Sequence, residues 1–544
     1  MTEQNIARAS AWMALGTIVS RLTGFLRLLL LFAVIGKSLN ADIFNNANTI
    51  PNALYILVAG GIFNVVLVPQ LVRAMKNDED GGDAYANRVI TLGLLVVASA
   101  TAILVVAVPW LVRLFFNARL FTPAFDQQRE SLELLAYLCM PQVFFYGSFV
   151  LIGQVLNARS RFGPMMWAPI VNNVVACAML VSYAIAFGTS DGREGFSAVQ
   201  SLLLGIGSTL AIATQTAVLV PFLRQAGFHF RPRFDFRGVG LSHTLRLGMW
   251  TLMFVAVNQV AFTIVQRLGT GATTAAASTG EDAGGSAVYE FGFLVSQMPH
   301  GVITVSLATA IIPTLSALAA ERRYDRFRLE LGRTLRIALV IVVPLAVVGG
   351  CLGQQAATVA GLVGSLNGNT QVIGYTIQAF ALAMVAFTVH YLMLRGFYAN
   401  EDTRTPFFIQ SVIAVVNIAT AIVLTSQVGP SRVAMMLALS YGISYVVGAV
   451  LSVLLLSRVV GPVLDREMLI FTGRLVVCAS LAAFVMLGVA LGLDAAGVDQ
   501  ARPLGGLLSA AGAAAAGGLT YVAAAKVVHM DQLTYLLRTV LRRS

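Results

Sequence analysis

Charged residues are scarce in this chain. Asp, Glu, Lys and Arg make up 11% of its 544 residues, less than half of the roughly 25% that is typical of a soluble domain. Hydrophobic residues make up 57%, and no polar stretch between the apolar blocks is long enough to form a separate domain. A water-soluble fold of this length is therefore excluded.

Motifs that carry chemistry are also scarce. The sequence has no P-loop, no Ser/His/Asp arrangement, no paired carboxylates and no metal-ligand spacing. Its 4 cysteines lie inside apolar segments without a CxxC spacing, which favours buried free thiols over a disulfide or a metal site. These absences argue against an enzyme, a bound cofactor and direct coupling to ATP.

The sequence does contain a long series of apolar segments. A transmembrane helix needs about 20 apolar residues. The segments of this kind span approximately residues 11–35, 43–72, 89–112, 132–156, 165–187, 198–223, 247–266, 287–319, 337–359, 372–394, 406–426, 433–457, 468–493 and 504–525. We predict an all-α polytopic membrane protein with 14 transmembrane helices.

Most of the basic residues fall on one side of this topology. The chain has 36 Lys and Arg against 25 Asp and Glu, a net charge of +11. The loops on the side that holds both termini carry most of the basic residues, so both termini are predicted to be cytoplasmic. No nucleic-acid partner is needed to explain the charge. The arginine-rich loops at 224–246 and 322–336 are interpreted as topogenic, with attraction of anionic lipid head groups as a second role.

Three proline landmarks recur in order at a nearly constant offset. The pairs are Pro51 with Pro299, Pro69 with Pro313, and Pro164 with Pro406. We infer a duplication into two parallel six-helix repeats. The predicted domains are an N-terminal six-helix lobe over 1–230, a C-terminal six-helix lobe over 231–460, and two extra transmembrane helices with a cytoplasmic tail over 461–544. Two equivalent lobes around a site at the membrane midplane are typical of an alternating-access transporter.

Two arginines interrupt the first apolar segment. An arginine at the centre of a transmembrane helix costs about 2.5 to 3.5 kcal/mol. Helical periodicity places Ser20, Arg21 and Arg27 on one polar face. Because the guanidinium fork suits phosphate, we predict that this face lines a water-filled cavity that binds an anion. The alternative is a structural role, with each arginine satisfied by helix carbonyls or by a salt bridge between the lobes.

Amides gather near the start of the second segment. Asn45, Asn48 and Asn52 follow Asp42 and share a face at helical spacing. Pro51, on the same stretch, frees a backbone carbonyl one turn earlier. We predict that these amides form the polar wall of the cavity. The alternative is that they hydrogen-bond between helices.

The eighth segment has a similar polar stripe around Pro299. Gln297 and His300 are candidate substrate contacts, although His300 could instead form a hydrogen bond across helices. Glu290 lies inside the same apolar segment, near its outer end. It is the candidate coupling carboxylate for a cation, or a partner for Arg27.

The stretch LRGFYANEDTRTP at residues 394–406 follows the tenth apolar segment. It closely resembles a motif of the MviN/MurJ family of lipid II flippases, which belongs to the multidrug/oligosaccharidyl-lipid/polysaccharide exporter superfamily. Further matches are SRLTGFLR at 20–27, AD at 41–42, IPN at 50–52, VP at 68–69, LNAR at 156–159 and FGP at 162–164. With the layout of apolar segments, the resemblance covers essentially the whole chain.

The resemblance implies two six-helix lobes and two C-terminal helices that help to form a groove for a polyprenyl tail. It places the family's cavity arginines on Arg21 and Arg27 and an acidic cavity residue on Asp42. Other charged positions of the family's best-known branch hold Leu28, Thr49, Tyr55, Ile56, Gly60 and Leu294 here. The amides of the second segment, with Gln297 or His300, are therefore expected to provide part of the binding.

The resemblance also implies a function. Lipid II, a disaccharide pentapeptide linked to undecaprenyl diphosphate, would move from the cytoplasmic to the outer leaflet of the bacterial inner membrane by alternating access. A cation or the membrane potential is expected to drive the cycle, and membrane lipids and cell-wall synthesis proteins are the expected partners. The alternatives are another lipid-linked oligosaccharide flippase or drug exporter of the superfamily, or a non-transporting scaffold for cell-wall synthesis.

Overall fold

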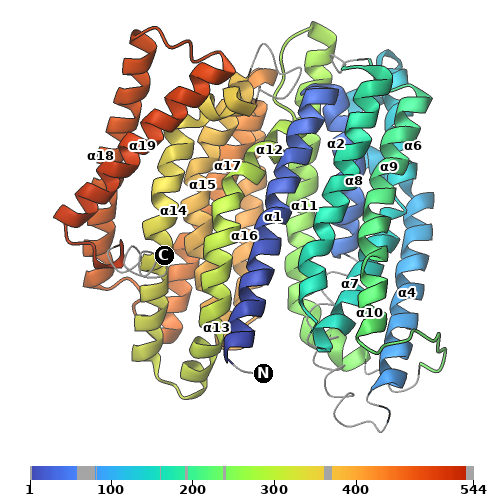
Figure 1. The fold of residues 1–544 in the computed structure, drawn as a ribbon, viewed down its shortest axis with the longest axis horizontal. Helices are drawn as coiled ribbons and strands as arrows, with labels where there is room; N and C mark the ends of the chain where they lie inside the picture. Colours follow the sequence, from blue (N-terminus) through green and yellow to red (C-terminus); the bar gives the residue numbers. More distant parts are fainter. Residues whose placement is uncertain are drawn as a thin grey trace. The chain divides into compact units, whose positions relative to one another are not determined.

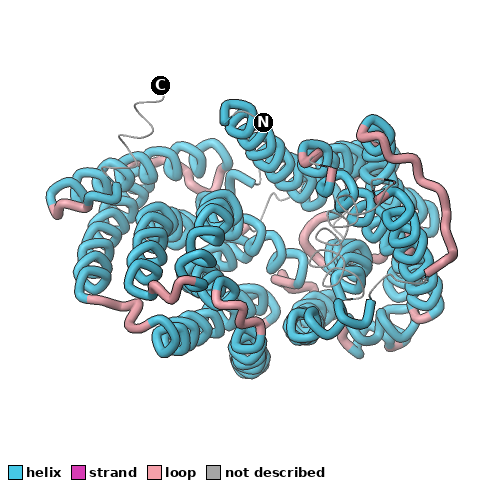
Figure 2. Tube along the Cα trace, turned by 90° about the horizontal axis from the view of Figure 1, so that it is seen from below, coloured by secondary structure: helices cyan, strands magenta, loops and turns pink. Residues whose placement is uncertain are grey.

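The computed structural model describes residues 3–57, 80, 82–159, 161–189, 194–236, 241–360 and 370–533. Within these ranges the chain forms helices joined by loops and no strand, as Figure 1 and Figure 2 show. Helix packing divides the chain into two units, Met1–Thr279 and Gly280–Ser544. The all-α prediction is confirmed for the described part of the chain.

The helices of the first unit run from the N-terminal region to Thr279. They are α1 (Glu3–Ile35), α2 (Leu39–Tyr55), α4 (Asp83–Val106), α5 (Val108–Phe115), η2 (Ala118–Phe121), η3 (Pro123–Phe125), α6 (Asp126–Cys139), α7 (Gln142–Ala158), α8 (Gly163–Phe187), α9 (Ala198–Ala217), α10 (Leu219–Gln225) and α11 (Leu241–Thr279).

The helices of the second unit begin at Ser286. They are α12 (Ser286–Pro299), the π-helical turn η4 (His300–Thr304), α13 (Val305–Ala320), α14 (Tyr324–Ala360), α15 (Gln371–Ala399), α16 (Arg404–Thr425), η5 (Pro430–Arg432), α17 (Val433–Val460), α18 (Arg466–Ala495) and α19 (Pro503–Val527).

Within the described residues, 13 helical stretches are long and apolar enough to cross a membrane. Each of them coincides with one of the apolar segments predicted from the sequence. The remaining segment, 43–72, begins in α2, but its part from residue 58 onward lies outside the described residues. The polytopic membrane architecture is therefore confirmed, and the count of 14 stays a prediction.

Local sequence explains several helix ends. Ser197 caps α9: its hydroxyl accepts the Gln200 N–H at 3.3 Å, and the Gln200 side chain accepts the Ser197 N–H at 2.8 Å. Asp465 caps α18 by accepting the Met468 N–H at 2.7 Å. Helix α8 ends before Gly188, whose φ of +73° is in the left-handed region that favours glycine. These capping residues and the glycine set where the helices begin and end, so consecutive apolar segments form separate helices.

One predicted loop is largely wrong. The arginine-rich stretch 322–336 is helical from Tyr324 onward, because α14 begins there and continues to Ala360. An ion pair between Asp325 and Arg328, one turn apart, stabilises its first turn. Helix α14 is kinked at Leu352, whose φ and ψ are not helical. At 1.5 Å per residue its part before the kink is about 42 Å long, beyond the roughly 30 Å of hydrocarbon, so its basic first turns extend outside the apolar layer.

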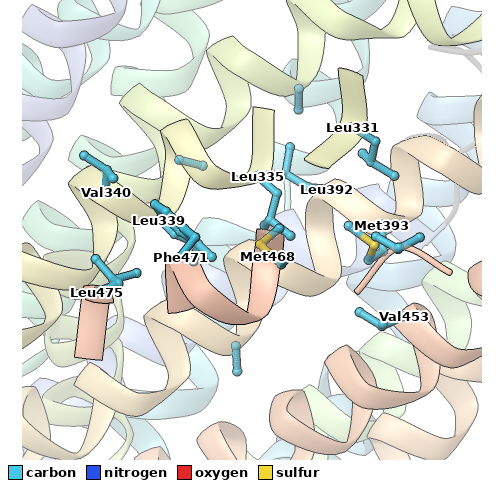
Figure 3. Packing of buried hydrophobic residues seen from close by; sticks show 14 of the residues in the cluster. Leu331, Leu335, Leu339, Val340, Leu392, Met393, Val453, Met468, Phe471 and Leu475 are labelled. Atoms are coloured by element: carbon cyan, nitrogen blue, oxygen red, sulfur yellow. The ribbon is translucent and has the colours of Figure 1, made fainter. Parts of the chain in front are cut away.

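The core of the second unit lies where α13, α14, α15, α17, α18 and α19 pack together. Figure 3 shows part of it, with Leu335 and Leu339 of α14 facing Met468 and Phe471 of α18. The Tyr521 hydroxyl of α19 also donates to a carbonyl of α14, the Val340 oxygen, at 2.9 Å. The last two helices are therefore an integral part of the second unit.

The boundary between the packing units does not coincide with the lobe boundary expected at 230/231. Helix α11 belongs to the first unit because it packs against α2, α5 and η2. Helix packing defines the two units, whereas sequence duplication defines the predicted lobes, so the two boundaries need not agree. The lobes 1–230 and 231–460 and the region 461–544 therefore stay predictions.

Candidate functional site

Helix α1 carries both arginines of the first segment and is held against α8 by polar contacts. The Asn173 side chain in α8 donates to the Ser20 carbonyl oxygen and to the Thr23 hydroxyl, each at 3.0 Å. Part of the polar face predicted for α1, including the Ser20 backbone, therefore serves helix packing. Arg27 lies farther along the same helix.

Beyond this contact, a cavity of about 140 Å³ opens among α1, α2, α7, α8 and α9, all within the first unit. We call it the Arg27 cavity. A single water needs only about 10 to 15 Å³, so the space can hold a substituent of a larger ligand together with water. Its polar lining residues are Arg27, Asn45, Asn48, Thr49, Asn52, Tyr146, Asn172 and Ser208.

The Arg27 cavity offers one positive charge and several hydrogen-bond donors. Among the described residues that line it, Arg27 alone is charged. Asn45 is 9% exposed, and its Nδ2 atom is buried with no hydrogen-bond partner in the described part of the chain. Asn48 Oδ1 accepts from Gln142 Nε2 at 2.9 Å, which leaves its own amide N–H groups available. A guanidinium beside neutral donors and away from carboxylates is suited to an anion such as phosphate.

The structure brings together some of the residues predicted from the sequence. Arg27, Asn45, Asn48 and Asn52 all line the cavity, so the amides of α2 form one wall as expected. Arg21 does not line it, because it lies six residues, or about 9 Å, back along α1. The Arg21 Nε atom is nevertheless buried with no hydrogen-bond partner among the described residues.

Asp42 also lies away from the cavity. Its side chain is completely buried, and its Oδ2 atom accepts a hydrogen bond from the Thr273 hydroxyl of α11 at 2.7 Å. Its backbone carbonyl accepts from the Asn46 side chain at 2.9 Å. In this structure Asp42 therefore joins α2 to α11.

The bond from Thr273 to Asp42 gives a stability prediction. Thr273→Val keeps the side-chain shape but removes the donor, and a buried acceptor that loses a partner costs about 1 to 3 kcal/mol. We expect a lower unfolding temperature in detergent. Thr274→Val is the matched control, because the buried Thr274 hydroxyl bonds within α11, to the Thr270 carbonyl at 2.6 Å. Equal unfolding temperatures for the two variants would contradict this role of Asp42.

In the second unit, His300 is buried in the turn that follows Pro299. Its Nδ1 lies 3.3 Å from the Thr388 hydroxyl, and its ring packs edge-on against Phe387 and Tyr391, with centroids 4.5 and 4.9 Å away. Gln297 Nε2 is buried without a hydrogen-bond partner among the described residues. His300 therefore forms a hydrogen bond to a neighbouring helix, α15, which is the structural role given above as its alternative.

Glu290 lies in the first turns of α12, which begins at Ser286, and its side chain is half-buried. Pairing Pro51 with Pro299 aligns the cavity residue Asn45 with Phe293. Phe293 packs against Phe380 at 5.8 Å and Tyr441 at 5.6 Å, measured between ring centroids. At this position an amide of the first repeat is therefore replaced by an aromatic ring in the second.

Comparison with known families decides the assignment. The family model described as lipid II flippase MurJ matches residues 31–497. The chain belongs to the MurJ family.

Its relatives and its fold agree with this membership. The chain is 27% identical to the probable lipid II flippase MurJ of Rhizobium tropici, over 75% of this chain and 73% of that protein. It is also 27% identical to the protein of the same name from Haemophilus influenzae, over 74% and 77%. A solved structure of lipid II flippase MurJ in an inward closed conformation aligns with a TM-score of 0.73 at 18% identity, covering 96% of this chain and 99% of that chain. A multidrug resistance MATE family transporter aligns with a TM-score of 0.62 at 14% identity, covering 81% and 95%.

This member of the MurJ family has a sparsely charged cavity. The sequence resemblance places an acidic family position on Leu28 and a basic one on Thr49. Both residues line the Arg27 cavity. Neutral amides stand beside a single guanidinium there, and the expectation that the amides of α2 take over part of the binding stays a prediction.

Sequence reasoning missed three polar residues of this MurJ-family cavity. Tyr146, Asn172 and Ser208 come from α7, α8 and α9 and line the space opposite the α2 amides. Asn172 and Asn173 form an amide pair within the apolar segment 165–187, and that pair was the available signal. Tyr146 and Ser208 have no local sequence signal, since packing alone brings them to the cavity.

Proposed function

We propose that this chain is a lipid II flippase that moves the lipid-linked head group from the cytoplasmic to the outer leaflet by alternating access. Membership of the lipid II flippase MurJ family supports the substrate. The observation that carries the mechanism is the Arg27 cavity, in which a guanidinium, the unpaired amide donor of Asn45 and further amides lie among helices of the membrane domain. No covalent step is needed, because the lipid changes leaflet and not structure.

The diphosphate is the part of lipid II that fits these donors. Arg27 would bind one phosphoryl group by a charge-assisted fork, and Asn45, Asn48 and Asn52 would complete its hydrogen bonds. Arg21, two turns back on the same helix, would bind the head group as it enters. The polyprenyl tail would stay in the lipid throughout.

Other predicted residues have more distant roles in this proposal. Ser20 and Asp42 would position α1 and α2 through the contacts with Asn173 and Thr273. Gln297 and His300 would supply contacts from the second unit. The buried donor of Gln297 supports its inclusion.

The chain is a multi-pass inner-membrane protein, and we propose that both termini face the cytoplasm. The excess of Lys and Arg in the loops on that side supports this orientation. Membrane lipids surround the helices, and cell-wall synthesis proteins are the proposed protein partners. A scaffold without transport would leave the polar cavity among the membrane helices without a role.

Coupling is proposed to use a cation or the membrane potential, with Glu290 as the candidate carboxylate. The experiment is transport of lipid II in proteoliposomes under separately imposed cation gradients and membrane potential. Dependence on one gradient, lost in Glu290→Gln, is the expected result. Indifference to every gradient would remove Glu290 from this role.

The function itself is tested by binding and rescue. Purified protein should bind lipid II in preference to undecaprenyl phosphate or cationic drugs, and Arg21→Ala should lose this preference. In cells depleted of their own flippase, Arg21→Ala should reach the membrane at the normal level without restoring growth. Full rescue by this variant, or equal binding of a cationic drug, would overturn the assignment.

A further inference from the structure

The loop after α10 is fixed along α4 in an extended form. Residues 228–236, which we call the strap, contain no helix and pass the lower end of α4 in Figure 1. The Arg231 N–H donates to Asn87 Oδ1 at 2.6 Å, and the Arg233 N–H donates to Thr91 Oγ1 at 3.0 Å. Four residues of a helix rise about 6 Å, and two residues of an extended chain rise about 6.6 Å. The spacing of donors on the strap therefore matches the spacing of acceptors on α4.

Pro232 fits this spacing. In an extended chain the N–H groups of residues 231 and 233 point to the same side, here toward α4, and the N–H of residue 232 would point away. Proline has no N–H group, so it fits at position 232 without losing a hydrogen bond. The acceptors are themselves held in place. The Asn87 amide donates to the Asp83 carbonyl at 2.9 Å, and the Thr91 hydroxyl donates to the Asn87 carbonyl at 2.7 Å.

Both ends of the strap are anchored at the ends of membrane spans. Arg159, just after α7, donates to the Ala226 carbonyl at 2.8 Å, and its guanidinium lies 5.3 Å from the centroid of the fully buried Phe228 ring. At the other end, Arg88 forms an ion pair with Asp235 at 2.6 Å. These contacts gather the end of α7, the end of α10 and the start of α4, so the strap lies at a boundary between membrane and water.

The strap exposes aromatic rings on one face and positive charge on the other, because successive side chains of an extended chain alternate between its two faces. Phe234 is 68% exposed and Phe230 is 41% exposed. Arg231 and Arg233 alternate with these rings along the sequence and are also exposed. Exposed aromatic rings beside arginines are unfavourable in water but typical of the lipid head-group region.

The acids near the strap do not cancel its charge. The hydrogen bond from Arg88 lowers the pKa of the Asp235 carboxyl, so Asp235 is ionised and matched by Arg88. Asp80, near Arg233, accepts the backbone N–H groups of Gly82 and Ala84 at 3.0 and 2.7 Å. Asp80 and Asp235 both interact with Arg233, so these two carboxylates face the three arginines Arg88, Arg231 and Arg233, which leaves an excess of positive charge.

We propose that the strap is a binding surface for an anionic phospholipid of the surrounding membrane. Phe230 and Phe234 insert at the level of the glycerol backbone, and Arg231 and Arg233 contact the lipid phosphate. Charge complementarity selects the anionic lipid, and the fixed backbone of the strap holds the four side chains ready without folding on binding. This surface is separate from the Arg27 cavity, and its occupant is a structural lipid and not the transported one.

The test uses the full chain carrying Phe234→Trp in nanodiscs, with tryptophan fluorescence quenched by brominated lipids; the signal of position 234 is the difference from the parent chain, which has 4 native tryptophans. We expect brominated phosphatidylglycerol to quench the introduced tryptophan more strongly than brominated phosphatidylcholine. Arg231→Gln with Arg233→Gln should abolish this preference, since each arginine near an anionic surface contributes about a fivefold change in partitioning. Quenching by phosphatidylcholine should remain.

A control variant outside the strap tests whether the effect is specific to the strap arginines. Arg322→Gln with Arg326→Gln removes two exposed arginines from the second unit and should leave the lipid preference at position 234 unchanged. Equal quenching by the two lipids before the arginines are removed would overturn the proposal. Absence of quenching by either lipid would also overturn it, because the strap would then face water or a protein. Lipid II transport, measured in parallel, reports on the flippase function independently.

Discussion

Arg27→Ala should abolish lipid II transport while the protein still folds and inserts. Arg27 is the one charged residue among the described residues that line its cavity. Truncating one partner of a buried, hydrogen-bonded charge pair costs about 2 to 5 kcal/mol, so the initial rate in proteoliposomes should fall at least about thirtyfold. Membrane insertion of Arg27→Ala should be at least as efficient as that of the wild type, because an arginine in a membrane span is costly.

The matched variant for this experiment is Arg27→Lys. Lysine keeps the charge but lacks the planar fork that binds two phosphate oxygens together. We expect transport between that of the wild type and that of Arg27→Ala. Equal rates for all three proteins would mean that Arg27 has no contact with the transported head group, and the diphosphate would have to bind elsewhere.

Asn45→Asp should be nearly as damaging as the loss of Arg27. The substitution keeps the shape of the side chain but replaces a buried donor on the cavity wall with a carboxylate. A carboxylate can pair with Arg27 and repels phosphate oxygens. Two unit charges 4 Å apart interact by about 4 kcal/mol at an effective dielectric constant of 20. Lipid II binding and transport should both be lost.

Two further variants separate charge from the loss of one hydrogen bond. Asn45→Ala removes a neutral donor worth about 0.5 to 1.5 kcal/mol and should weaken binding by about tenfold or less. The double variant Arg27→Ala with Asn45→Asp should be at least as damaging as Arg27→Ala alone, because the new carboxylate then repels phosphate with no guanidinium beside it. If Asn45→Asp and Asn45→Ala behaved alike, the cavity would not be an anion site.

The helices were predictable from the sequence because the bilayer imposes one rule on every span. Each apolar segment needs about 20 residues and closes its backbone hydrogen bonds internally, so composition alone locates it. The wall of amides on α2 was predictable for a related reason. Asn45, Asn48 and Asn52 are costly in an apolar segment, and their spacing places them on one helix face.

The remainder of the site depends on contacts between helices that the sequence does not record. The roles of Asp42 and Ser20 depend on Thr273 and Asn173, which are far away in the chain. The helical start of α14 escaped prediction because charged residues form exposed helical turns as readily as loops. The cavity lies within one packing unit, whereas the sequence duplication predicts a binding site between the two lobes.

The composition of the Arg27 cavity restricts how a ligand can leave it. Among the described residues that line it there is no carboxylate, imidazole or amine, and a guanidinium keeps its proton throughout the physiological range. Acidification or alkalinisation on either side of the membrane therefore leaves the charge of these described lining residues constant. A bound anion must be released by movement of the lining helices or by a competing anion. A proton that drives the cycle would have to act at another position, from which it moves these helices.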